Sequence, residues 1–89
     1  MSQIEKLLVK LRRRPVPTDM RIDEICKLAE YYGCEVKRNG GKHSLHIVYK
    51  ALGRVIPIPT HGDRVKDVYV QMIKQLINDI EESRGASQL

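Results

Sequence analysis

The spacing of the apolar residues changes twice along this 89-residue chain, and these two changes constrain its fold more than any other feature. Up to Gly33 the apolar residues recur at helical spacing, from Cys34 to Ile58 they alternate with polar residues, and from Val65 to Ile80 the helical spacing returns. The alternating segments are joined by connections of hairpin length, for which an antiparallel meander is the economical topology. The pattern therefore predicts a single α+β domain of two layers: a helix, a three-stranded antiparallel sheet and a second helix, with both helices on one face of the sheet.

Glycine and proline mark where these elements begin and end. The first core helix is expected at residues 22–32, because Gly33 can adopt the left-handed conformation that closes a helix. Pro57 and Pro59 have the same parity along the third strand, so their missing N–H groups point to the same side. That side must face away from any neighbouring strand, and the third strand is therefore predicted to be an edge and a poor template for strand addition. The three strands and the last helix are expected at residues 34–37, 44–50, 54–58 and 65–80.

A further helix is predicted ahead of this core, at residues 2–13, and two prolines that follow it end the helix. We interpret residues 1–17 as a helix and linker appended to the core, residues 18–82 as the folded domain, and residues 83–89 as a polar, flexible tail. The apolar residues that recur at helical spacing in the first segment are Ile4, Leu7, Leu8 and Leu11.

The basic charge of the chain is concentrated in its centre. The sequence carries 16 Lys and Arg against 11 Asp and Glu, a net of +5. Residues 36–66 have a net charge of +6, with Asp63 as their one acid, whereas residues 17–35 are acidic. A basic surface of this kind suits a polyanion or an acidic protein as partner. Phe and Trp are absent, so we do not expect single-stranded nucleic acid to be read by stacking on aromatic side chains.

The composition argues against several classes of protein. The apolar runs are too short for a membrane span or a secretory leader, so we expect no membrane association. Cys26 and Cys34 are too few for the disulfide framework of a small secreted domain, and we expect both to be reduced and buried in a cytoplasmic protein. The sequence contains neither the paired Cys and His spacing of a zinc site nor a phosphate-binding loop, so we expect no metal ion and no small-molecule cofactor.

The strongest candidate for a functional site is the turn Asn-Gly-Gly-Lys-His at residues 39–43. Its adjacent glycines, Gly40 and Gly41, can fold the backbone so that successive N–H groups point at an anion, as in a phosphate-binding nest. Lys42 adds a cation, and His43 adds a group that titrates near neutral pH, as acid–base catalysis requires. A pair of glycines is equally what a simple hairpin turn uses, so the residue types alone favour a structural role for this turn.

The other two histidines lie in different contexts. His46 has the parity opposite to Leu45 and Ile47, which places it on the uncovered face of the sheet, where an exposed histidine is usually incidental. His61 lies in the connection between the third strand and the last helix. It can brace that connection, or it can join His43 if the fold brings the turn and the connection together.

Three stretches of the sequence resemble the HicA toxins of bacterial and archaeal toxin–antitoxin pairs: IDEICKLAEYYGCEVKRN, GGKHSLHIVY and VIPIPTHGDRVKDVYVQMIKQLI. The resemblance covers residues 20–80. It implies a fold like that of double-stranded-RNA-binding domains, cleavage of mRNA, an essential histidine in a Gly-Ser-His motif, and neutralisation by a HicB antitoxin. Matched position by position, the histidine is His43 and the glycine is Gly41, and Lys42 stands where the family usually has serine. His61 matches the histidine of the family's Pro-x-His-Gly loop.

With this resemblance, we expect the chain to be a metal-independent endoribonuclease, an mRNA interferase of a type II toxin–antitoxin pair, with His43 as the general acid or base. Its expected partners are mRNA and a HicB-like antitoxin. The antitoxin is expected to bind over the basic open face of the sheet and to shield His43. Two alternatives from other classes are a non-catalytic RNA-binding module and a basic protein that only docks an acidic regulator. The residues expected to hold the RNA are Arg38, Gly40, Gly41, Lys42, Arg54, His61, Arg64 and Lys66.

Overall fold

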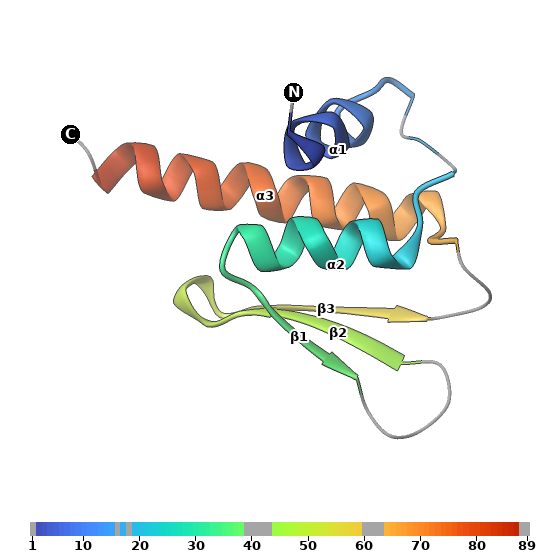
Figure 1. Ribbon diagram of the computed structural model, residues 1–89. Helices are drawn as coiled ribbons and strands as arrows, with labels where there is room; N and C mark the ends of the chain where they lie inside the picture. The colour runs from blue at the N-terminus through green and yellow to red at the C-terminus, as the bar shows by residue number, and fades with distance from the viewer. Residues whose placement is uncertain (1, 16, 18, 39–43, 60–63, 88–89) are drawn as a thin grey trace.

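The computed structural model of the chain describes residues 2–15, 17, 19–38, 44–59 and 64–87. Its elements follow in the order α1 (Gln3–Leu11), α2 (Ile22–Tyr31), β1 (Glu35–Arg38), β2 (Ser44–Tyr49), the short 3-10 helix η1 (Lys50–Leu52), β3 (Arg54–Pro59) and α3 (Asp67–Ser87). The predicted α+β class is confirmed, with a helix, a three-stranded antiparallel sheet and a helix behind a further N-terminal helix. The helices lie on one side of the sheet and leave its other face uncovered (Figure 1).

α2 ends at the glycine that the sequence indicates. Gly33 has a φ of 85°, in the left-handed region, and the N–H of Cys34 donates to the carbonyl of Ala29 at 2.9 Å. These two features close the helix and turn the chain back towards the sheet. β1 therefore begins only two residues after this glycine.

The sheet has the strand order β1-β2-β3, which makes both β1 and β3 edges and confirms the prediction for β3. Leu45 of β2 pairs with Ile58 of β3, and Ile47 pairs with Ile56. These four side chains are buried against the helices, because residues of one parity share a face of the sheet. The residues of the other parity, which include His46, face away from the helices, as predicted.

α1 is part of the core, so the prediction that it is merely appended to the core is wrong. The helix lies on the side of α2 and α3 that is away from the sheet, and it adds a third layer (Figure 1). Leu7 and Leu11 are buried in the same apolar cluster as the residues of the sheet and α3. The sequence pattern shows that this helix has an apolar face but does not say what covers it. Ion pairs join α1 and the residue after it to both core helices: Lys10 to Glu24 at 3.2 Å, and Arg12 to Glu81.

α3 is longer than its apolar stripe predicts. The stripe ends at Ile80, and the sequence pattern predicts a tail from residue 83, but the helix continues to Ser87. Polar contacts with the C-terminal end of α2 hold this extension. The hydroxyl of Tyr32 donates to Glu81 at 2.9 Å, and Arg84 donates to the carbonyl of Tyr32 at 2.9 Å. Such contacts leave no trace in hydrophobic periodicity, which is why the sequence pattern misses the end of the helix.

Candidate nucleic-acid interface

The two histidine-bearing connections leave the sheet at the same end. Ser44, the first residue of β2, pairs with Pro59, the last residue of β3. The turn at residues 39–43 leads into Ser44, and the connection at residues 60–63 continues from Pro59. Their points of attachment are therefore neighbours across the β2–β3 ladder (Figure 1).

Most of the expected site residues lie outside the described part of the chain. His43 is one residue from Ser44, and His61 is two residues from Pro59. Both histidines lie outside the described residues. The other expected residues outside the described part are Gly40, Gly41 and Lys42.

α2 and α3 also begin at this end of the molecule (Figure 1). Arg21, directly before α2, forms an isolated antiparallel bridge with Arg64, shortly before α3. The N–H of Val65 donates to the carbonyl of Met20 at 2.9 Å. The segments that lead into the two helices thus run side by side, and the positive ends of both helix dipoles point towards the end of the sheet where the turn is attached.

Four basic residues are exposed on the segments that meet here. None of them forms an ion pair with an acidic side chain among the residues that the structure describes. Exposed cations of this kind can neutralise phosphates. Arg21 is not among the residues expected from the sequence, where its position directly before a helix is the only signal. The four residues are Arg21, Arg38, Arg64 and Lys66.

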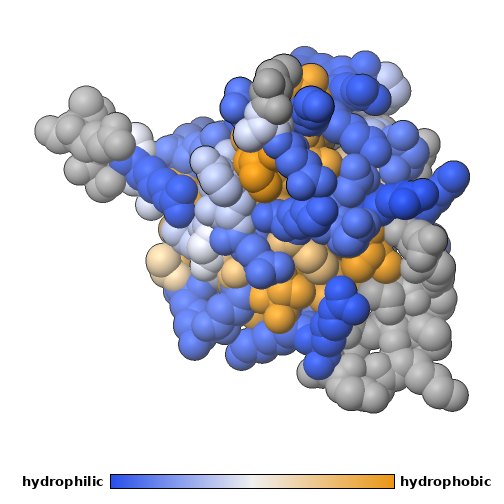
Figure 2. All heavy atoms as spheres, in the orientation of Figure 1, coloured by the Kyte–Doolittle hydropathy of each residue, from blue (hydrophilic) through white to orange (hydrophobic). Residues whose placement is uncertain are grey.

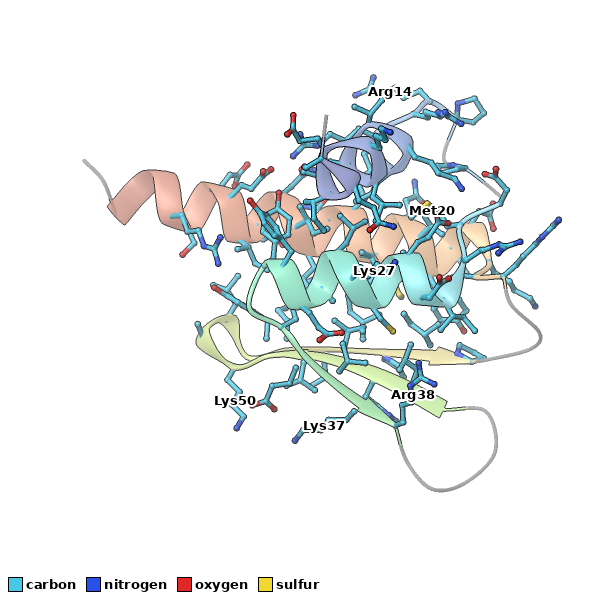
Figure 3. All side chains as sticks on the ribbon, viewed as in Figure 1. Arg14, Met20, Lys27, Lys37, Arg38 and Lys50 are labelled. Atoms are coloured by element: carbon cyan, nitrogen blue, oxygen red, sulfur yellow. The ribbon has the colours of Figure 1, made fainter. Side chains whose placement is uncertain are left out.

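Arg38 ends β1 next to the turn at residues 39–43. Figure 3 shows its side chain on the helix side of the sheet, whereas Lys37 points to the opposite side. Arg38 also interacts with the thiol of Cys26, but burial is the larger effect and raises the pKa of this cysteine. Burial likewise raises the pKa of Cys34, and both cysteines are free. Neither thiol is therefore suited to act as a nucleophile at neutral pH.

The structure does not bring Arg54 to this end. Arg54 begins β3 at the far end of the ladder, opposite Tyr49. Its guanidinium donates to Asp79 of α3 at 2.7 Å, and Gln75 donates to the other oxygen of the same carboxylate. The hydrogen bond from Arg54 is the main reason that the pKa of Asp79 is lowered. Arg54 thus links the sheet to α3.

The open face of the sheet carries a mixed set of side chains. His46 lies in the middle strand, between Lys37 of β1 and Pro57 of β3. Along the same face Glu35 bonds to both Lys37, at 3.6 Å, and Lys50, at 3.3 Å. Two of the cations on this face are therefore engaged with one carboxylate, whereas Arg21, Arg38, Arg64 and Lys66 lie at the end of the sheet.

The described residues were also compared with two other kinds of structure, a metal site and a membrane-spanning helix. Among them, no three His, Cys, Asp or Glu side chains gather in a way that could hold a metal ion. None of the helices in the described ranges combines the length and the apolar character needed to cross a membrane.

Comparison of the chain with protein-family models, with curated proteins and with solved structures finds no match. The function of the chain is therefore inferred from its residues and from their arrangement.

Proposed function

We propose that this protein is an RNA-cleaving toxin of the HicA type, a metal-independent endoribonuclease in which His43 performs the acid–base step. The observation that carries the proposal is the pairing of Ser44 with Pro59. This pairing attaches the glycine turn that ends in His43 and the connection that contains His61 to adjacent positions of one sheet end. Both histidines that match the HicA pattern are attached there, and they come from two separate segments of the chain.

The second support is the charge around this end. Three separate segments that meet here carry exposed basic residues with no acidic partner among the described side chains: Arg21, Arg38, Arg64 and Lys66. Phosphate contacts position a nucleic acid without reading its sequence, and a basic patch at helix N-termini supplies such contacts. The duplex or folded RNA would be held by its backbone, since the chain has no aromatic platform of Phe or Trp for unpaired bases.

The chemistry that fits these groups is attack by the RNA's own 2′-hydroxyl. His43, as the neutral imidazole, takes the proton of the 2′-OH while the 2′-oxygen forms a bond to phosphorus. The bond from phosphorus to the 5′-oxygen breaks, and this leaving oxygen takes a proton from His61 or from water. The products are a 2′,3′-cyclic phosphate and a 5′-hydroxyl. Lys42 and Arg38 neutralise the charge that develops on the phosphate oxygens.

Cleavage by purified protein, with chelator present, tests this mechanism. We expect His43→Ala to lower the rate by about 10²–10⁴, the usual contribution of a general acid or base. The matched control is His46→Ala, which removes a histidine from the open face of β2 and should leave the rate unchanged. An RNA with a 2′-deoxy sugar at the cleaved position should bind but remain intact. Undiminished cleavage by His43→Ala would refute the assignment, and binding without cleavage by the wild type would favour the non-catalytic RNA-binding module.

We further propose a HicB-like antitoxin as the protein partner, because a nuclease of this kind has to be held inactive. An acidic partner would associate quickly with the basic end of the sheet at low salt. Hydrogen exchange with and without the antitoxin provides the measurement. Protection confined to α1, with residues 39–46 as exposed as before, would show that inhibition does not work by covering the site.

A further inference from the structure

The two edges of the sheet differ in their capacity to accept another strand. On β3, Pro57 and Pro59 have no N–H, so both must occupy positions whose backbone groups point away from β2. Two of the outward donors of this edge are therefore missing, and β3 is closed to strand addition. β1 contains no proline along its four residues.

The position of the prolines also indicates which backbone N–H and C=O groups of β1 point away from β2. Since Pro57 points its backbone groups outward, its partner His46 directs its own N–H and C=O to β1, where it pairs with Lys37. The neighbours of Lys37 in β1 must then point the other way. The backbone N–H and C=O groups of Val36 and Arg38 are consequently directed out of the sheet at its free edge.

The space beside this edge is open. A groove runs between α2 and β1, and its lining residues come from both elements: Cys26, Glu30, Cys34, Glu35, Val36 and Arg38. Figure 2 shows apolar residues exposed between the hydrophilic side chains of the helix layer and those of the sheet. A strand that pairs with β1 would find room on the helix side for its own side chains.

We propose that β1 pairs antiparallel with β1 of a second copy of this chain, with Val36 opposite Val36 of that copy, to form a continuous sheet across a two-fold axis. An interface of this type uses the same residues twice. In this register the outward groups of the two Val36 residues face each other and can exchange two hydrogen bonds. The pairing ends at Cys34, opposite Arg38, because the N–H of Cys34 already donates to Ala29 within its own chain.

Charge complementarity selects this register and this partner. When Val36 lies on the axis, Glu35 stands directly opposite Lys37 of the second copy, and Lys37 stands opposite Glu35. Opposite charges at directly facing positions stabilise a strand pair, and like charges destabilise it. A shift of the axis to Lys37 would oppose two lysines, and a shift to Glu35 would oppose two glutamates. Of these registers, only the one centred on Val36 pairs opposite charges on both sides of the axis.

Sedimentation of the full chain from about 10 µM to about 1 mM, a range suited to a small interface, tests the pairing. We expect a monomer–dimer equilibrium in the wild type. Glu35→Lys and Lys37→Glu should each weaken it at least about tenfold, because each replaces two attractive pairs with two repulsive ones. The double variant Glu35→Lys/Lys37→Glu should restore the dimer, since it exchanges the charges and keeps them complementary. Lys6→Glu on α1 is the control with the same change of net charge as Lys37→Glu and should have no effect.

Amide exchange followed by NMR provides a second measurement that does not depend on these variants. The amides of Val36 and Arg38 should become more protected as the protein concentration rises. A chain that stays monomeric at the highest concentration would overturn the proposal and leave the β1 edge to a strand of a different protein. A dimer that both single variants leave intact would also overturn it, because the copies would then meet through another surface. Neither outcome would bear on RNA cleavage by His43.

Discussion

Arg38 and Arg54 stand at opposite ends of the sheet, and their surroundings assign them different roles. Arg38 is exposed beside the glycine turn and has no acidic partner among the described side chains. Arg54 is held by Asp79 at 2.7 Å. An arginine engaged with a carboxylate would have to give up that pair before it could bind a phosphate, so Arg54 should contribute little to RNA affinity.

The pair formed by Arg54 and Asp79 makes the stability depend on pH. The pKa of Asp79 is lowered in the folded state, so the stabilisation is present above the ordinary pKa of an aspartate, about 4, and is lost as the pH falls through the lowered value. We expect Arg54→Ala to melt at a lower temperature than the wild type at neutral pH. The difference should disappear in strong acid, where Asp79 is protonated in both proteins. Thermal unfolding followed at several pH values provides the measurement. A difference that persists in strong acid would mean that Arg54 stabilises through packing instead.

Among the elements, α1 is the one whose contribution to the core can be tested by substitution. Leu11 is fully buried, at 0% exposure, whereas Val9 on the same helix is 56% exposed. Leu11→Ala should therefore destabilise the whole protein by about 2–5 kcal/mol, as for other buried leucines. Val9→Ala should change the free energy of unfolding by no more than about 0.5 kcal/mol. Urea unfolding measures both. Equal, small effects would mean that α1 contributes little to the fold.

The elements themselves were predictable because each one leaves a local mark on the sequence. The change of apolar spacing at Gly33, its return near Val65 and the parity of Pro57 and Pro59 predict the helix, the strands and the edge. The position of α1 was not predictable, since an amphipathic stripe is compatible with many covering surfaces. The last turns of α3 depend on polar contacts with Tyr32, which lies far away along the chain.

The candidate site was predictable only in part, because the partners of its residues come from distant parts of the chain. The sequence shows which basic residues lie near the turn, but it does not show which acidic residues they pair with. The ion pair of Arg54 with a residue 25 positions later, and the bridge that brings Arg21 beside Arg64, arise only when the elements pack together. The paired ends of β2 and β3 likewise follow from the register of the sheet.

For the whole molecule, the basic end of the sheet predicts how RNA binding responds to salt. Removing one cation that neutralises a phosphate should reduce the steepness of log K against log salt by about 0.7–0.9. We expect this reduction for Arg38→Ala, Arg64→Ala and Lys66→Ala. Lys6→Ala, which removes an exposed lysine on α1, is the control and should leave the slope unchanged. A slope reduced by Lys6→Ala alone would place the RNA on α1.

The prolines of β3 also bear on whether this protein can form fibres. A sheet with two open edges can add copies at both sides without limit, which is the route to filaments and amyloid. With Pro57 and Pro59 on β3, the edge of the described sheet that can still pair is β1, and growth stops once two copies have paired through it. The same two residues that place β3 at the border of the sheet thus keep a self-pairing strand from polymerising, and replacing both with valine would remove this protection.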